Sequence, residues 1–379
     1  MMKVGVFHPS LYNFGGGEFV ALVITNTLAK NGYQTELFVS NRVQQSQIQK
    51  MFGEKINPSA KIRVKPAFTN PGGSLDLFPT VFRSLAFSTK CDILIDTYSN
   101  CVFPWTDVCY IHYPFLNPYS YRKNFPYLKS RNPRHIIGPP YLIYGKKLEN
   151  YENKLIIANS KYSANAMKEF VNVNVEVMYP PVPSFMFNQP SELLTDQNRE
   201  DLVVTVSRFA PEKELEKIPY IAKRTKSNLK FTLIGLLHDR RVYESILENI
   251  KRLGLNGRIE VIANASKKEV DNILRRAKIY LHTMAGEHFG ISIVEAMAVG
   301  CIPIVPRLGG MIEYVPSIYA YETIEEAAEK IQSSILKWTP KRAAKMIDIA
   351  NQFSESHFSE RFATSFSKYI ERRDTHRKS

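Results

Sequence analysis

The sequence predicts an α/β protein built from two doubly wound parallel-sheet domains. Short apolar runs of strand length alternate with helical patterns in the first half of the chain. A stretch rich in proline and polar residues interrupts the alternation, which then restarts. At 379 residues the chain is too long for one ordinary core, and its 44% hydrophobic residues can supply two. Strands that alternate with helices in this way predict parallel sheets with helices on both faces.

The first half of the chain contains five runs that we interpret as strands. They cover residues 4–8, 35–39, 92–96, 108–112 and 155–158. A helix is expected over 18–30, because Gly32 stands where a glycine usually ends a helix. Ser160 is a suitable N-cap for a further helix that reaches Phe170.

The domain boundary is expected after the stretch Tyr-Pro-Pro-Val-Pro at 179–183, where a polar segment follows. We therefore assign residues 1–185 to a first Rossmann-like domain and 200–355 to a second. Residues 356–379 are expected to form a C-terminal helix that packs back toward the first domain and ends in a basic tail.

The second half repeats the alternation without an obvious sequence repeat. Its expected strands cover residues 202–206, 231–234, 259–262, 279–282 and 302–305. Helices are expected among and after them, for example at 241–253, 341–353 and 359–372.

The amino-acid composition limits which partners the chain is expected to bind and in which cellular compartment it is expected to act. The chain carries 50 Lys and Arg against 36 Asp and Glu, a formal net charge of +14. Solubility explains this excess, and so does an anionic partner, which is the favoured explanation: a ligand, a membrane surface or nucleic acid, among which charge alone does not choose. The four cysteines form no CxxC pair and no zinc-like spacing, which favours a reducing, cytoplasmic compartment and no metal site (Cys91, Cys101, Cys109, Cys301). Residues 1–3 lead straight into a strand, and no apolar run is long enough for a membrane span, so any membrane contact is expected to be peripheral.

Two loops lie where ligands bind in parallel sheets, beyond the carboxyl ends of strands. The first is Gly15-Gly16-Gly17-Glu18, whose backbone N–H groups and helix N-terminus favour an anion, although a plain tight turn explains it equally well. The second runs from Ala285 to Gly300 and contains Glu287 and Glu295. A helix is expected to begin there near Gly290, where the exposed N–H groups of Phe289, Gly290 and Ile291 could hold a phosphate. Two solvated carboxylates are the structural alternative for the pair of glutamates.

Three further side chains follow strands in the same way. Arg208 and Lys213 leave the strand at 202–206 and could clamp a diphosphate, or could simply be solvated surface charges. His112 closes the strand at 108–112, where a core position and a catalytic position are both open.

Together these residues resemble the retaining glycosyltransferases of family 4, which have the GT-B fold of two Rossmann-like domains with a cleft between them. The resemblance covers most of the chain, from residue 7 to about 313. It rests most on Glu287-His-Phe-Gly290-Ile-Ser-Ile-Val-Glu295, with support from several shorter matches. These are Phe7-His8-Pro9 before the glycine loop, Tyr110-Ile-His112-Tyr-Pro114, Pro211-Glu-Lys213 and Gly309-Gly310-Met-Ile-Glu313.

The resemblance implies roles for individual residues. Arg208 and Lys213 would neutralise the diphosphate of a nucleotide-sugar donor, which the second domain would bind. Glu287 would hold sugar hydroxyls, and Glu295 would bind the nucleotide ribose. The first domain would take the acceptor. Its loop residues Gly16 and Gly17 would close over the diphosphate, and His112 would lie beside the transferred sugar.

The greatest similarity is to mannosyltransferases that extend lipid-linked oligosaccharides on the cytosolic face of a membrane, the Alg11 type. It implies GDP-mannose as donor and a lipid-linked glycan as acceptor. Two departures leave the donor open: eukaryotic enzymes of that type begin with a membrane-spanning segment, and they commonly have an arginine where this chain has Ala210. A glucosyltransferase that uses UDP-glucose and an epimerase of the same fold are the alternatives. A non-catalytic partner subunit is another alternative.

The chain has no Asp-x-Asp motif, so no metal or other cofactor is expected. A nucleic-acid-binding protein would explain the charge, but no recognised binding module is present.

The segment between His112 and Lys154 is unusually basic and rich in tyrosine. Its eight cations are Arg122, Lys123, Lys129, Arg131, Arg134, Lys146, Lys147 and Lys154, and it has seven tyrosines. It is either an ordinary solvated loop or a patch that docks peripherally on an anionic membrane.

Overall fold

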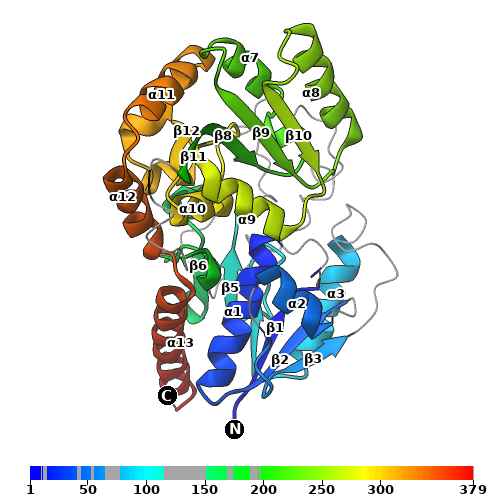
Figure 1. Cartoon of the computed structure of the whole chain (residues 1–379). Helices are drawn as coiled ribbons and strands as arrows, with labels where there is room; N and C mark the ends of the chain where they lie inside the picture. Colours follow the sequence, from blue (N-terminus) through cyan, green and yellow to red (C-terminus); the bar gives the residue numbers. More distant parts are fainter. Residues whose placement is uncertain are drawn as a thin grey trace. The chain divides into compact units, whose positions relative to one another are not determined.

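The computed structural model describes residues 1–9, 11, 15–40, 44–52, 55–64, 77–114, 151–168, 174–187, 195 and 198–378. The chain divides into two compact units. Unit 1 consists of Met1–Pro183 together with Ser354–Ser379, and unit 2 consists of Ser184–Phe353. Figure 1 shows the elements of both, from the blue strands of unit 1 to the red helix that returns to it. Most of the basic segment described above, residues 115–150, lies outside the described residues.

Unit 1 contains a parallel sheet of seven strands in the order β3-β2-β1-β4-β5-β6-β7. These strands are β1 (Lys3–Phe7), β2 (Gln34–Val39), β3 (Lys61–Val64), β4 (Ile93–Asp96), β5 (Val108–Ile111), β6 (Leu155–Ala158) and β7 (Glu176–Val177). The strand order reverses between β1 and β4, which is the position where open parallel sheets bind ligands.

The helix α1 (Gly16–Lys30) is buried along almost its whole length, from Glu18 to Ala29. One side packs on the sheet, and the other packs against α13 (Glu355–Lys378), whose Phe358, Phe362 and Phe366 join the same core. The last element of the chain is therefore part of the first unit (Figure 1). The remaining helices of unit 1 are α2 (Gln45–Phe52), α3 (Leu77–Ser88) and α6 (Lys161–Lys168).

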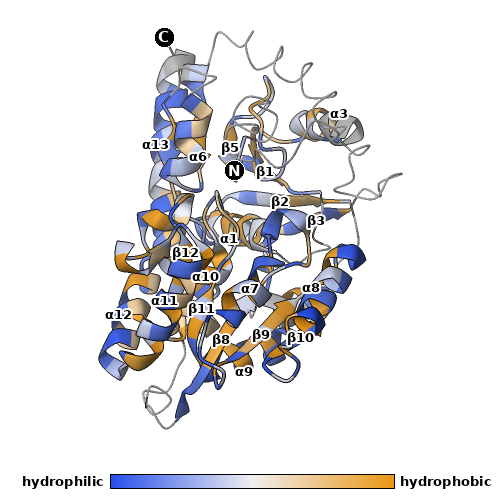
Figure 2. Cartoon of the chain, turned by 90° about the horizontal axis from the view of Figure 1, so that it is seen from above, coloured by the Kyte–Doolittle hydropathy of each residue, from blue (hydrophilic) through white to orange (hydrophobic). Residues whose placement is uncertain are grey.

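Unit 2 contains a parallel sheet of six strands in the order β10-β9-β8-β11-β12-β13. They are β8 (Glu200–Val206), β9 (Lys230–Gly235), β10 (Ile259–Ala263), β11 (Ala277–Leu281), β12 (Ile302–Pro306) and β13 (Ala320–Tyr321). The helices are α7 (Lys217–Lys223), α8 (Arg240–Arg252), α9 (Lys267–Arg276), α10 (Ile291–Ala298), α11 (Ile324–Leu336) and α12 (Pro340–Asn351). Figure 2 shows apolar strands at the centre of this unit and helices with hydrophilic outer faces. The order reverses between β8 and β11, which defines the ligand-binding edge of this unit.

The structure confirms two doubly wound parallel sheets and corrects several element boundaries. Ser160 caps α6 as expected, since its Oγ accepts from the Ser163 N–H at 3.0 Å, and the described part of the helix ends at Lys168. The last helix begins at Glu355 rather than at residue 359 and extends to Lys378, because Phe358 supplies an additional buried turn. The helix expected at 341–353 covers Pro340–Asn351, where proline occupies the first turn and Thr339 is the N-cap.

Candidate functional site

The loop that follows β8 places Lys213 at the reversal point of unit 2. Phe209 is buried and fixes this loop to its neighbours: its N–H donates to the Leu236 carbonyl at 2.9 Å, and its carbonyl accepts from Asp239 at 2.8 Å. Gly235 is required beside the loop, because a Cβ there would collide with the Ser207 carbonyl. The 3₁₀ turn Pro211–Lys213 then ends at Glu214, which has a φ of 51°. Lys213 is thus held by a rigid turn at the edge of the sheet.

Lys213 points at Glu287, across the reversal from β8 to β11. Its Nζ lies 2.6 Å from Glu287 Oε2 and 3.3 Å from Met284 Sδ. The Lys213 carbonyl accepts from the Thr283 hydroxyl at 2.7 Å, which ties the turn to the end of β11. Both charged side chains are largely buried, at 17% and 13% exposure. The structure therefore joins two residues of the sequence prediction that are 74 positions apart.

Arg208, the other predicted cation of this loop, lies apart from that pair. Its guanidinium is 45% exposed and forms an ion pair with Glu212 at 3.2 Å, one helical turn along the chain. An exposed pair of this kind adds little to stability, so the side chain can be redirected to a ligand at low cost.

The Gly309-Gly310 step holds the backbone of Glu287. The Gly310 N–H donates to the Glu287 carbonyl at 2.7 Å. Gly309 has a φ of 129°, and a Cβ there would lie 2.5 Å from the Glu287 carbonyl oxygen. Only glycine allows this close approach, so the double glycine positions Glu287 rather than serving as a free turn.

The helix α10 begins where the sequence predicted. Gly290 is its N-cap in the left-handed conformation, with a φ of 87°. Phe289 is buried against Tyr314, whose hydroxyl donates to the Phe289 carbonyl at 2.7 Å. The first N–H groups of a helix have no acceptor within it, so that of Ile291 points out of the N-terminus with its positive potential. This end of α10 has the properties of a phosphate site.

Glu295, one and a half turns further along α10, has a separate cationic partner. Lys267 Nζ, at the start of α9, lies 2.6 Å from Glu295 Oε1 and 5.7 Å from the centre of the Phe185 ring. Sequence reasoning missed Lys267, because nothing in the local sequence relates it to a glutamate 28 positions away. The two predicted glutamates therefore occupy two distinct ion pairs, one before the start of α10 and one within it.

The charge state of Glu287 depends on its neighbours. Burial alone would raise the pKa of this carboxyl, but Lys213, His282 and His288 outweigh burial and hold the pKa well below its usual range. His282 Nε2 lies 3.4 Å from Glu287 Oε2, and burial lowers the pKa of its ring. At neutral pH the site therefore contains the Glu287 carboxylate, paired with Lys213, and a neutral His282 imidazole. Sequence reasoning placed His282 at the end of a strand and did not select it.

The candidate residues of unit 1 form a second, uncharged group. Gly16 and Gly17 open α1, and a Cβ on Gly17 would lie 3.3 Å from His112 Nε2. The His112 N–H donates to Asn100 Oδ1 at 2.7 Å, and its ring Nε2 lies 3.2 Å from the Thr97 carbonyl. A carbonyl can only accept, so Nε2 carries the hydrogen and Nδ1 is left as an acceptor.

Burial keeps both histidines of this group neutral. It lowers the pKa of His112 to about 4, and together with the neighbouring His112 it lowers the pKa of His8 to about 3. His8 Nδ1 forms a 2.9 Å hydrogen bond with the Thr97 hydroxyl. Glu18 accepts from the Gly15 N–H at 3.0 Å, so a carboxylate already occupies one amide of the glycine loop. This contact caps the N-terminus of α1 and fits a tight turn at the glycine loop.

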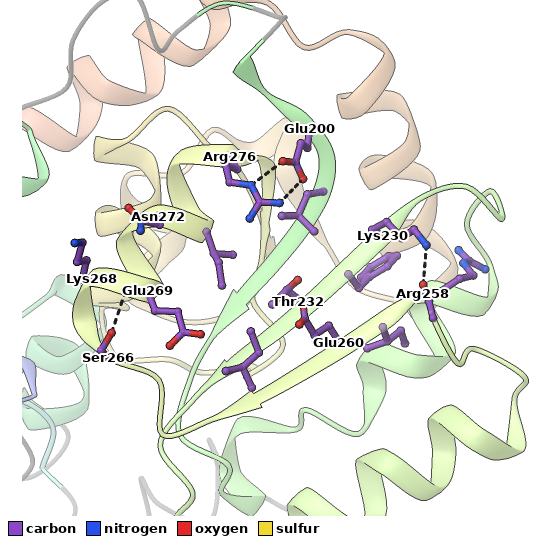
Figure 3. Close-up of a pocket in the computed structure, with 16 residues that line it drawn as sticks. Glu200, Lys230, Thr232, Arg258, Glu260, Ser266, Lys268, Glu269, Asn272 and Arg276 are labelled. Atoms are coloured by element: carbon purple, nitrogen blue, oxygen red, sulfur yellow. Dashed lines mark hydrogen bonds and ion pairs between the residues drawn. The ribbon is translucent and has the colours of Figure 1, made fainter.

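A pocket of about 700 Å³ opens elsewhere on unit 2 and contains none of the predicted residues (Figure 3). It is lined by the first residues of β8, β9 and β10 and by one face of α9. Glu200 and Arg276 neutralise each other there at 2.6 Å. The other charged side chains of the lining are the cations Lys230, Arg258 and Lys268 and the carboxylates Glu260 and Glu269. Among the residues that the structure describes, no group of three or more His, Cys, Asp or Glu is placed to hold a metal ion.

Comparison with known proteins relates this geometry to sugar transfer. Residues 191–353, nearly all of unit 2, match the family model for glycosyl transferases group 1. The chain is 25% identical to a GDP-Man:Man(3)GlcNAc(2)-PP-Dol alpha-1,2-mannosyltransferase of Dictyostelium discoideum, over 97% of this chain and 84% of that protein. The human protein of the same name is also 25% identical, over 97% of this chain and 87% of its own length.

The fold of the whole chain is similar to those of solved structures. HepE of Anabaena, crystallised with UDP and glucose, has a TM-score of 0.71 at 19% identity and covers 97% of this chain and 100% of its own. Sucrose-phosphate synthase of Thermosynechococcus elongatus has a TM-score of 0.73 at 13% identity, over 98% and 99% of the two chains. The chain therefore has the GT-B fold of two Rossmann-like units, and its second unit is a glycosyltransferase domain of group 1.

Proposed function

We propose that this chain is a retaining, metal-independent mannosyltransferase of family 4 that transfers mannose from GDP-mannose to a lipid-linked glycan. The observation that carries the proposal is the Lys213–Glu287 ion pair beside the N-terminus of α10, at the reversal point of unit 2. The choice of mannose, GDP and a lipid-linked acceptor follows the names of the relatives that match along 97% of the chain.

Lys213 and α10 would supply the positive charge that the leaving group requires. Breaking the bond between the sugar C1 and the phosphate oxygen leaves a negative charge on the diphosphate. The Lys213 ammonium and the N–H groups of Phe289, Gly290 and Ile291 lie on fixed elements and need no rearrangement to stabilise it. Arg208, exposed and weakly paired, would approach from the solvent side. These groups perform the role that a divalent cation performs in metal-dependent transferases.

The two glutamates would bind opposite ends of the donor. Glu287 is ionised and its carboxylate is fixed, so it can accept hydrogen bonds from sugar hydroxyls. Glu295, near the start of α9, would accept from the ribose hydroxyls. In unit 1 the neutral His112 would offer Nδ1, or its backbone, to the transferred sugar. The acceptor oxygen would form the new C1–O bond on the same face, and the departing phosphate would take its proton.

The chain is proposed to act at the cytosolic face of a membrane as a peripheral protein. Among the residues that the structure covers, no helix is both long enough and apolar enough to span a bilayer. The cations and tyrosines between His112 and Lys154 would provide the contact, at roughly 1 kcal/mol for each cation near anionic lipid. Co-sedimentation with vesicles that contain anionic lipid should fall as salt rises, and it should weaken when the cations at 122–134 are changed to serine. Absence of binding at low salt would remove the membrane from the proposal.

Transfer with a defined donor and acceptor tests the proposal directly. The purified chain is incubated with GDP-mannose or UDP-glucose and a short isoprenoid diphosphate that carries a mannose-containing glycan. Mannose should be added with the α-configuration and GDP released. Transfer from UDP-glucose alone would change the donor to the first alternative. Release of a free epimer, without transfer from either donor, would overturn the proposed reaction.

A further inference from the structure

One carboxylate oxygen of Glu287 is within reach of two donors. Oε2 lies 2.6 Å from Lys213 Nζ and 3.4 Å from His282 Nε2. Oε1 accepts from the His288 N–H at 3.2 Å. Without a ligand, the ammonium satisfies Oε2, and the contact with His282 does not reach hydrogen-bond geometry.

Under the proposed function, Lys213 would have to neutralise two anions, the Glu287 carboxylate and the donor diphosphate. A donor diphosphate beside the turn at Pro211–Lys213 would attract the only ammonium that pairs with Glu287 among the described residues. Glu287 is buried, and a buried carboxylate that loses its partner is strongly penalised. The site therefore needs a second group to hold Glu287 when Lys213 turns to the phosphate.

His282 is built into the position that such a group requires. Its backbone is fixed on both sides: the N–H donates to the Ile304 carbonyl at 2.9 Å, and the carbonyl accepts from the Tyr321 hydroxyl at 2.8 Å. The side chain is only 4% exposed, and Nε2 has no hydrogen-bond partner among the residues that the structure describes. A shift of a few tenths of an ångström would convert the contact with Glu287 into a hydrogen bond.

We infer that His282 is a positioning residue that takes over Glu287 when Lys213 engages the donor diphosphate. It keeps the carboxylate ionised and directed at the sugar while the lysine is occupied. The inference rests on the proposed function for its kinetic consequence. The exchange of partners through Glu287, however, can be measured without any turnover.

A matched pair of variants separates this role from simple packing. Glutamine places an amide N–H near the position of Nε2, whereas asparagine places it near Nδ1. His282→Gln should retain at least half of the wild-type kcat, and His282→Asn should lose about 10-fold, with the dissociation constant for GDP changed less than about twofold in both. Equal losses in the two variants, or a loss in GDP binding that accounts for the whole effect, would overturn the inference.

A thermal double-mutant cycle tests the partner exchange independently of the reaction. When Lys213→Ala removes the ammonium, Glu287 must rely on His282. Lys213→Ala combined with His282→Asn should therefore lower Tm by at least about 2 °C beyond the sum of the single changes. The excess should vanish in a Glu287→Gln background, which has no charge to hold. Additive effects would overturn the inference. Coupling in a protein that transfers no sugar would instead refute only the proposed function.

Discussion

The two units place their candidate residues at equivalent positions, beyond the carboxyl ends of strands near the reversal of strand order, but they treat charge in opposite ways. In unit 2, Lys213 and Lys267 are each paired with a glutamate at 2.6 Å. In unit 1, His8 and His112 are both buried and kept neutral by that burial. The sheets are alike, so the fold does not decide this difference; the side chains at the strand ends do. Unit 2 is equipped to stabilise a developing charge, and unit 1 to offer neutral hydrogen bonds.

Removal of the Lys213 ammonium should lower the catalytic activity more than any other change. Lys213→Ala should lower kcat/KM by at least about 30-fold, since it removes charge stabilisation of the leaving diphosphate. Arg208→Ala should act in the same direction. Lys217→Ala is the matched control, because Lys217 pairs with Glu214 nearby at 2.9 Å without reaching Glu287. A folded Lys213→Ala protein with near-native activity would remove this residue from the mechanism.

Acidification should destabilise unit 1, in which burial keeps the histidines neutral. The pKa of His112 is about 4 when folded and about 6.5 when unfolded, so below pH 6.5 the unfolded chain takes up protons first. The stability that His112 contributes should thus be complete above pH 6.5 and fall by up to about 3 kcal/mol between pH 6.5 and 4. The buried His8, with a pKa of about 3, adds to the decline in the same direction. Hydrogen exchange of the α1 and β1 amides reports on unit 1 separately. His112→Asn should flatten the decline. Identical slopes would show that His112 is not held neutral.

The two glutamates of unit 2 should separate binding from turnover. Glu295→Ala should weaken binding of the bare nucleoside diphosphate about 10-fold, because it removes acceptors for the ribose. Glu287→Ala should leave that affinity nearly intact and lower kcat. Calorimetry and steady-state kinetics measure both, with Glu244→Ala on the outer face of α8 as the control. Equal loss of nucleotide affinity in both variants would mean that the roles are not divided in this way.

Chelation of divalent metal ions should change the reaction rate less than any of the substitutions. If fixed cations replace a metal ion, excess EDTA should change the rate less than about twofold. Assays before and after chelation, with and without added Mn²⁺ or Mg²⁺, measure this directly. Complete loss that either ion restores would contradict a charge-based mechanism in unit 2.

The sheets were predictable from the sequence because buried parallel strands are continuous apolar runs. The run at 155–158 coincides with β6, and most other strands differ by one or two residues at their ends. The strands β3, β7 and β13 were missed. The strands β7 and β13 have only two residues each, and β3 lies at the edge of its sheet and is only partly buried. Burial therefore decided which of the longer strands could be predicted. A strand that is covered on both faces is a continuous apolar run, which the sequence reveals clearly.

Within the site, the sequence indicated individual residues but not their partners. Glu287 and Glu295 were recognisable from their spacing around Phe289 and Gly290. Their pairing with Lys213 and Lys267 depends on how β8, α9 and α10 meet in space, which no local pattern encodes. His282 was overlooked for the same reason, since a histidine at a strand end has meaning only once its neighbour across the sheet is known.

The return of α13 to unit 1 has a consequence for biosynthesis. The aromatic residues that cover α1 belong to Ser354–Ser379, so the ribosome makes them only after all of unit 2. During translation the second unit can close its core while the first still exposes one side of a helix that is buried along almost its whole length in the finished protein. The nascent first unit is therefore a natural client for chaperones until the final helix emerges. A C-terminal truncation would damage the N-terminal half of the protein, far from the deletion in sequence.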